Sequence, residues 1–206
     1  MRPARLGRVR RRRSTVPINE SINAAHPRLL LLDGDGSVFL QLASAEDSEQ
    51  LYRLVHENRQ QLAGHLPWAR DIDFEEMHQA VQESVNRIGE DGWLQYRIMV
   101  PNAAQQHDMV GTVTLHGRDI TQHSAHLNCW LAPKAQGHSY ARKAIQRLLA
   151  YAVPAWRLQC VFLDIEPGNE PAERLAARLK AVPTDQLREE KVGDQATVRR
   201  VWELRC

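Results

Sequence analysis

The chain has 206 residues, of which 43% are hydrophobic and 25% are charged. That length is enough for one domain with a substantial core, and the composition is typical of an ordinary soluble protein. No apolar run approaches the roughly 18 residues that a membrane-spanning helix requires, so we predict no membrane association. The histidines are scattered, without CxxC or HExxH spacing, and predict no metal site.

The formal net charge of +2 conceals an uneven distribution. Seven arginines precede the first acidic residue, Glu20, and the remaining 20 basic residues face 25 acidic ones. We therefore separate a basic, disordered leader at 1–27 from a single domain at 28–206. Clustered arginine releases counterions from nucleic acid, which makes RNA or the ribosome a candidate partner of the leader. A solvated extension without a binding role is the simpler alternative.

The expected compartment is the cytoplasm. No apolar core of roughly 7–15 residues follows the arginines, as a secretory signal requires. The three cysteines, Cys129, Cys160 and Cys206, are odd in number and not closely paired, which argues against a disulfide framework and fits a reducing environment. The oligomeric state stays open, with a homodimer as one option.

The first half of the domain has the pattern of a β-hairpin followed by two helices. Hydrophobic periodicity predicts strands at 29–32 and 38–42 and helices at 45–61 and 73–88. Asp33-Gly34-Asp35-Gly36 supplies turn residues between the strands. Ser44 suits the N-cap position of the first helix, and Gly89 is a residue that ends the second helix.

The second half returns to strands after Gly92. We expect strands at 94–100, 109–115 and 124–131, a helix at 137–153, a strand at 158–165, a helix at 171–179 and a last strand at 198–204. This order predicts a mixed sheet with helices on its faces.

The segment from Cys129 to Ala141 is the most informative, because a strand leads through small residues into a long helix. Such a loop presents backbone N–H groups at the positive end of the helix dipole, which suits a pyrophosphate. The same residues also suit a plain helix cap, so spacing alone leaves both interpretations open.

Trp130-Leu131-Ala132-Pro133 followed by Gln136-Gly137-His138-Ser139-Tyr140-Ala141 resembles the acetyl-CoA loop of the GNAT superfamily. The pattern of that loop is Gln or Arg, two variable residues, Gly, one variable residue, then Gly or Ala. Gln136 and Ala141 match, whereas Ser139 stands where the pattern has Gly, and its Cβ crowds the approach to the pyrophosphate. The resemblance implies acetyl-CoA as cosubstrate and these contacting residues: Leu131, Gln136, Gly137, His138, Ser139, Tyr140 and Ala141.

Two further segments resemble the ribosomal-protein N-acetyltransferases of the RimJ/RimL type. The stretch from Phe162 to Asn169 is similar to their strand and Gly-Asn turn, where the Asn bonds the pantetheine arm of the cofactor. A helix cap at Asn169 is an equal alternative. The stretch from Asn58 to Trp68 resembles their first helix and acceptor loop, which implies substrate binding by Trp68. The pieces span roughly 38–204.

The resemblance implies the GNAT fold of the α/β (α+β) class, a mixed, mostly antiparallel twisted sheet of about seven strands with helices on both faces. It also implies transfer of an acetyl group to an amine. In such a reaction the enzyme accelerates the attack by holding the two substrates together and by removing a proton from the amine. Related enzymes carry a Glu where this chain has His126. Strand alternation puts His126, Asn128 and Trp130 on one face, so His126 is the candidate base and Asn128 a candidate acceptor contact. A structural role for His126 is the alternative.

The match weakens at three positions. Ser139 replaces a Gly, Ala172 replaces the Ser that protonates the leaving thiolate, and Lys180-Ala181 replaces a Gly-Phe pair. Tyr140 or Tyr151 can substitute as the acid, with Tyr140 preferred.

The predicted function is therefore acetyl transfer from acetyl-CoA to a protein N-terminal α-amine. A small-molecule amine or antibiotic is the alternative acceptor, and a catalytically degenerate CoA-binding protein is the alternative class.

Overall fold

The computed structural model describes residues 30–32, 36–88, 92–104, 106–192 and 195–206. The predicted leader at 1–27 and Gly89 lie outside the described residues, as does most of the turn between the first two strands. The elements in chain order are β1 (Leu30–Leu32), β2 (Phe39–Leu42), η1 (Ala45–Asp47), α1 (Ser48–Glu57), α2 (Arg59–Leu62), η2 (Pro67–Ala69), α3 (Phe74–Asn86), β3 (Leu94–Pro101), β4 (His107–Asp119), β5 (Ser124–Leu131), η3 (Pro133–Ala135), α4 (Tyr140–Trp156), β6 (Cys160–Ile165), α5 (Glu170–Arg178), β7 (Val182–Val192) and β8 (Gln195–Arg205).

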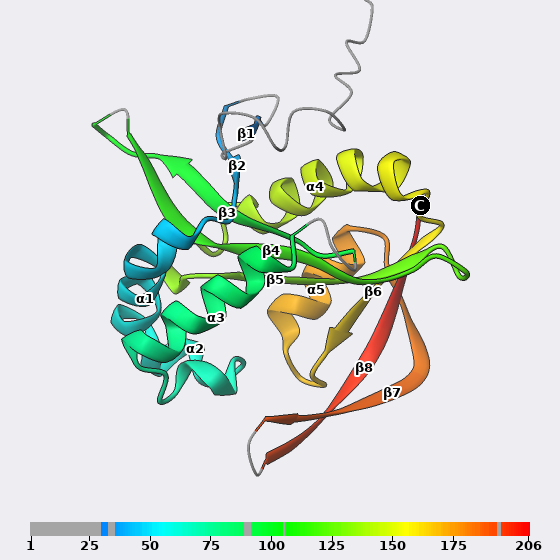
Figure 1. The fold of residues 1–206 in the computed structure, drawn as a ribbon. Coiled ribbons are helices and arrows are strands. Elements are labelled where there is room, and N and C mark those ends of the chain that lie inside the picture. The colour runs from blue at the N-terminus through cyan, green and yellow to red at the C-terminus, as the bar shows by residue number, and fades with distance from the viewer. Residues whose placement is uncertain (1–29, 33–35, 89–91, 105, 193–194) are drawn as a thin grey trace, which may run out of the picture.

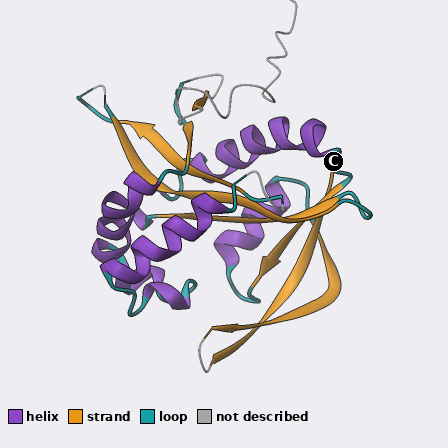
Figure 2. Cartoon of the chain, in the orientation of Figure 1, coloured by secondary structure: helices purple, strands orange, loops and turns teal. Residues whose placement is uncertain are grey.

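The described strands form one eight-stranded sheet in the order β1-β2-β3-β4-β5-β6-β8-β7. Every neighbouring pair is antiparallel except β5 and β6, which run parallel. The predicted mixed, mostly antiparallel sheet is confirmed, and Figure 2 shows its strands between the helices.

Helices cover both faces of the sheet, as predicted (Figure 1). On one face, Leu127 and Leu131 of β5 pack into a core with Ile145 and Leu148 of α4. On the other face, Trp130 packs against a second cluster built from α1 and α3, whose buried residues include Leu51, Val55, Met77 and Val81. The side chains of β5 therefore alternate between two separate cores.

The predicted helix at 45–61 is wrong as a single element, because it begins with the 3-10 turn η1 and then divides at Asn58 into α1 and α2. Asn58 has φ −115° and ψ 13°, and its Nδ2 donates to the carbonyl of Leu54, so its side chain replaces backbone bonding there. The predicted helix at 137–153 begins later, at Tyr140, and residues 137–139 form a loop instead. Because α4 begins at Tyr140, this loop lies directly in front of the N-terminal end of α4.

The sequence patterns missed β7, which makes the eighth strand. It pairs only with β8, lies at the edge of the sheet, and exposes most of its described side chains. Without a buried face it has no apolar alternation, the signal by which a strand is predicted. None of the helices in the described part of the chain is both long and apolar enough to cross a bilayer.

Candidate active site

The strands β5 and β6 separate at the centre of the sheet. Their parallel pairing covers three positions and ends where His126 lies opposite Phe162. From there β5 continues to Leu131, paired only with β4 on its other side. The sheet therefore opens beside the second half of β5, and the chain leaves this opening through the loop that precedes α4.

This loop, residues 136–139, is exposed. Gln136 ties it to the end of β5, because its Nε2 donates to the carbonyl of Leu131 at 3.2 Å. The first N–H groups of a helix have no acceptor within it, and the first turn of α4 contains no acidic residue. The loop and helix end therefore present N–H groups that suit an anion.

Two residues of the loop have left-handed backbone. Gly137 has φ 81°, and a Cβ added there would meet no atom within 4 Å, so the space in front of it is open. Ser139 has φ 63° and ψ 11°, and its side chain makes no capping bond. A Gly at this position avoids the steric penalty that Ser139 carries, which gives the departure from the GNAT pattern a physical cost.

Tyr140 is the first residue of α4, and its ring stacks on His138 with centroids 5.4 Å apart. Tyr151 lies eleven residues further, about 16 Å along the helix axis. Burial raises the pKa of Tyr151, and its neighbour is the core residue Tyr96. Of the two candidate acids, only Tyr140 lies at the loop.

Asn169 and Ala172 occupy the turn and first residues of α5. The Oδ1 of Asn169 accepts a hydrogen bond from the backbone of Ala172 at 3.2 Å, so the helix-cap interpretation is confirmed. The Nδ2 of Asn169 has no partner among the described residues, and the pantetheine role therefore stays a prediction. Lys180 has φ 68°, a left-handed conformation where the RimJ/RimL pattern has Gly.

His126 lies in a polar cluster that the sequence patterns did not foresee. Its Nδ1 is 3.2 Å from Oδ2 of Asp164 on β6, and its Nε2 is 2.9 Å from Nη1 of Arg188 on β7. The ring of His116, directly across on β4, stacks against it with centroids 5.6 Å apart. Asn128 donates from Nδ2 to Nε2 of His116 at 3.1 Å.

The charges of this cluster set its protonation. Burial, followed by the electrostatic effect of His126, lowers the pKa of His116 to about 4, so His116 is neutral near pH 7 and accepts from Asn128. Burial alone would raise the pKa of Asp164. The hydrogen bond and electrostatic effect of His126, with the charges of Arg188 and Arg199, outweigh burial and lower that pKa.

Trp68 and Trp130 border a pocket on the same face of the sheet as His126 and Asn128. The pocket has a volume of about 220 Å³ and lies among α1, η2, α3 and the central strands. Its lining carries no charged side chain: Leu51, Trp68, Ile72, Met77, Ala80, Val81, Gln95, Thr112 and Trp130. The pocket therefore favours an uncharged group.

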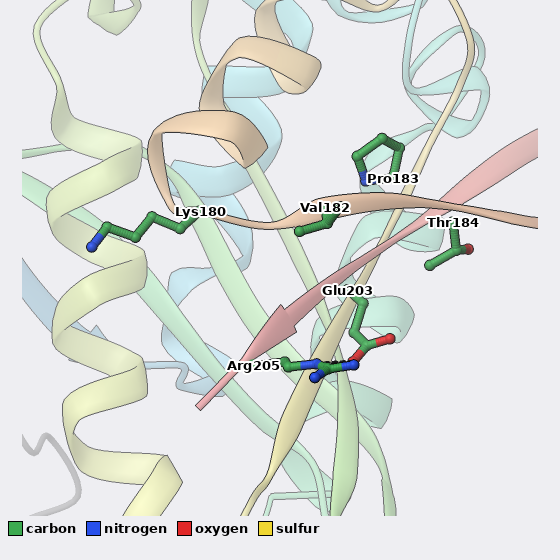
Figure 3. Close-up of a pocket in the computed structure, with 6 residues that line it drawn as sticks. All are labelled: Lys180, Val182, Pro183, Thr184, Glu203 and Arg205. Carbon is green, nitrogen blue, oxygen red and sulfur yellow. Dashed lines mark hydrogen bonds and ion pairs between the residues drawn. The ribbon is translucent and has the colours of Figure 1, made fainter.

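A larger pocket, of about 400 Å³, lies elsewhere, between the end of α5 and the strands β7 and β8 (Figure 3). It is lined by Lys180, Val182, Pro183, Thr184, Glu203 and Arg205. Glu203 and Arg205 pair with each other at 3.1 Å, and none of the predicted site residues lines the pocket. Its greater size does not make it the better candidate.

An opened sheet with a helix end beside it that suits an anion is the arrangement expected of an acyl-CoA-dependent transferase. The chain belongs to the GNAT acetyltransferases, because residues 37–182 match the family described as "Acetyltransferase (GNAT) domain". The predicted family is confirmed, and the protein is an acyltransferase.

Similar proteins carry related names. A Bacillus subtilis (strain 168) protein, YdaF, provisionally named a ribosomal N-acetyltransferase, is 20% identical over 142 residues, which are 69% of this chain and 76% of that protein. The apo structure of RimL, a ribosomal L7/L12 α-N-protein acetyltransferase, matches with a TM-score of 0.76 at 16% identity, and the match covers 88% of this chain and 96% of the RimL chain. The microcin C7 self-immunity acetyltransferase MccE, solved with acetyl-CoA and AMP, matches with a TM-score of 0.73 at 14% identity, and the match covers 82% of this chain and 93% of the MccE chain.

Proposed function

We propose that this protein transfers an acetyl group from acetyl-CoA to a protein N-terminal α-amine. The observation that carries the proposal is the exposed loop at 136–139, which presents backbone N–H groups and the N-terminal end of α4 beside the opened sheet. The proposed setting is the cytoplasm, with the arginine-rich leader as a contact to RNA or the ribosome.

Acetyl-CoA fits this loop. The backbone N–H groups from Gly137 to Ala141 would hold the pyrophosphate, and the open space in front of Gly137 leaves room for it. Asn169 would donate from Nδ2 to the pantetheine arm. The similar protein MccE was solved with acetyl-CoA bound, which supports the same donor here. Bound in this way, acetyl-CoA supplies the acetyl group as a reactive thioester.

His126 is the proposed base. It lies where β5 and β6 part, on the same face as Asn128 and Trp130, so an acceptor that enters the pocket beside Trp130 lies along this row. A neutral imidazole accepts the proton of the acceptor ammonium, which frees the nitrogen lone pair to attack the thioester carbonyl carbon. Tyr140 at the loop is the proposed proton donor for the thiolate that leaves.

The acceptor class rests on the pocket and on the similar proteins. RimL is named as acting on the α-amine of ribosomal protein L7/L12, and YdaF carries a ribosomal name. The pocket beneath Trp68 and Trp130 has an uncharged lining, and it suits the uncharged side chain of an N-terminal residue better than a polyamine.

A matched pair of variants tests the cofactor site. Gly137→Asn and Gly137→Asp have nearly the same shape, and both side chains tolerate left-handed backbone. The added carboxylate repels a pyrophosphate, so titration calorimetry with acetyl-CoA should show Gly137→Asp at least about tenfold weaker than Gly137→Asn. Equal affinity of the two variants would contradict a pyrophosphate at this loop.

The acceptor is tested by mass spectrometry. Peptides with free N-termini and a panel of small amines are incubated with acetyl-CoA, and a mass gain of one acetyl group is sought on each. Acetylation confined to the α-amine of peptides supports the proposal. Acetylation of small amines alone favours the alternative acceptor, and tight acetyl-CoA binding without transfer to any acceptor favours a degenerate CoA-binding protein.

A further inference from the structure

The floor of the uncharged pocket crosses three strands of the sheet. Trp130 of β5 lies directly opposite Thr112 of β4, and Gln95 of β3 pairs with Thr114, two residues from Thr112 on the same face. Trp130, Thr112 and Gln95 all line the pocket. Among the described strands, β5 has no partner on its other side beyond His126. The floor therefore begins at the opening between β5 and β6 and runs away from it across β4.

The width of this floor determines which side chains can use it. Neighbouring strands lie about 4.8 Å apart, so a group that enters from the opening crosses one strand spacing between Trp130 and Thr112. The side chains of alanine and serine are too short to cross that spacing, whereas an extended methionine side chain spans it. With its α-amine at the opening, an acceptor reaches the far part of the pocket only if its first side chain is long.

The volume and the walls of the pocket favour the same kind of side chain. The volume of about 220 Å³ equals the space of roughly seven water molecules at about 30 Å³ each, far more than a serine side chain fills. The walls are apolar, and Leu51, Met77 and Val81 are anchored in the buried cluster beneath α1 and α3. A long apolar side chain therefore removes apolar surface from water on both sides of the contact.

The polar groups of the floor offer little to a polar side chain. The Oε1 of Gln95 already accepts from Oγ of Ser84 at 2.8 Å and from Nη1 of Arg97 at 3.0 Å, and its Nε2 donates to Oγ1 of Thr114 at 3.2 Å. None of the residues that the structure describes hydrogen-bonds the hydroxyl of Thr112. That single hydroxyl lies across the strand spacing, beyond the reach of a serine.

The open side of the pocket is formed by a small residue. Ala80 of α3 lines the pocket and is exposed to solvent, so a larger side chain there narrows the pocket without entering the buried cluster. Its neighbour Gln79 is also exposed on α3 but does not line the pocket. The two positions therefore allow a matched pair of variants.

We propose that this pocket is the subsite for the first side chain of the acceptor, and that it selects a long apolar side chain, methionine above all, over alanine or serine. This inference rests on the proposed function, because it places the α-amine of the acceptor at the opening between β5 and β6. The selection follows from the reach across the floor, the volume of the pocket and its apolar walls.

The kinetic test uses peptides that differ only in the first residue: methionine, norleucine, alanine or serine. We expect kcat/KM for the methionine peptide to be at least about tenfold higher than for the alanine and serine peptides. Norleucine has the same length without the sulfur, so its peptide should match the methionine peptide within a few-fold.

Variants of the lining test whether this pocket makes the selection. Ala80→Phe should lower the ratio of kcat/KM for the methionine and alanine peptides at least about tenfold, whereas Gln79→Phe should leave the ratio as it is in the wild type. Thr112→Val keeps the shape of the floor and removes its hydroxyl. It should raise kcat/KM for the methionine peptide several-fold, because that hydroxyl no longer has to be buried beneath an apolar side chain.

A second measurement does not depend on transfer. Titration calorimetry with CoA in place of acetyl-CoA measures peptide affinity alone, and CoA binding shows that each variant is folded. The methionine peptide should bind tightest to the wild type and lose its advantage in Ala80→Phe.

Serine or alanine peptides equal to the methionine peptide in both measurements would overturn the inference. Equal ratios in Ala80→Phe and Gln79→Phe, or a loss of methionine acetylation in folded Thr112→Val, would overturn it as well. Binding of the methionine peptide without acetyl transfer to any peptide would count against the proposed function and leave the subsite standing.

Discussion

Trp68 and Trp130 meet edge to face, with ring centroids 6.2 Å apart and planes at 69°. Trp68 comes from η2, and Trp130 from the central strand β5. The sheet thus supplies the ring of Trp130, and the short helix η2 at the border of the pocket supplies the ring of Trp68. The pair forms one border of the uncharged pocket in which we place the acceptor.

Replacing Trp68 should weaken acceptor binding without affecting the donor. An aromatic pair contributes about 0.5–1.5 kcal/mol beyond its buried area, so Trp68→Ala should raise the acceptor KM by roughly twofold to twelvefold. Steady-state kinetics with a peptide acceptor measures the change, and calorimetry should find the acetyl-CoA affinity unchanged. Trp68→Phe keeps a ring and is the matched control; equal KM values for the Ala and Phe variants would contradict a role for the aromatic pair.

Ser139→Gly should stabilise the protein. The left-handed conformation costs a residue with a Cβ about 1–2 kcal/mol, and the greater freedom of Gly in the unfolded chain returns about 0.5–1 kcal/mol of that. The expected net gain in the free energy of unfolding is about 0.5–1 kcal/mol, or an increase in Tm of roughly 1–4 °C for a chain of this size. Thermal unfolding followed by circular dichroism measures it. A decrease in Tm would show that the Ser139 hydroxyl makes a compensating contact.

The low pKa of His116 makes the stability depend on pH. Its folded pKa of about 4 lies below the ordinary value of 6.5, so the unfolded chain binds the proton more readily. The contribution of His116 is fully present above about pH 6.5 and is lost as pH falls from 6.5 towards 4. Urea unfolding at a series of pH values should show this loss in the wild type and a flatter curve in His116→Gln. Parallel curves for the two proteins would contradict the assignment.

The ion pair between Arg97 and Asp47 is buried, with their side chains 0% and 5% exposed and Nε 3.4 Å from Oδ2. Arg97 also donates from Nη1 to Gln95 at 3.0 Å. Burial lowers the pKa of Arg97, and the charge of Asp47 opposes that shift. Removing one partner leaves a buried charge uncompensated, so Asp47→Asn should cost about 3–5 kcal/mol in the free energy of unfolding.

The double variant Asp47→Asn/Arg97→Met separates the pair from its surroundings. Because it removes both charges, its loss of unfolding free energy should be smaller than the sum of the two single losses. Denaturant titration of the four proteins gives the coupling energy. Strict additivity would mean that the two side chains act independently.

The order of the elements, the family and the loop before α4 were predictable from local patterns. The strand at 124–131 was predicted with both ends correct, and the separate packing of Trp130 and Leu131 follows from alternation along it. Periodicity and the composition of the Gln136 to Ala141 loop are properties of neighbouring residues, so they are visible in the chain itself.

What surrounds His126 was decided only by the tertiary structure. Asp164 and Arg188 reach it from strands 38 and 62 residues further along the chain, and their meeting depends on the register of β5, β6, β8 and β7. No local pattern encodes that register, and β7 itself lacks the buried alternation by which strands are predicted. Local patterns in the amino-acid sequence thus determined most of the elements and the loop before α4, whereas long-range strand pairing determined which charges face the proposed base, because such pairing depends on contacts between distant segments.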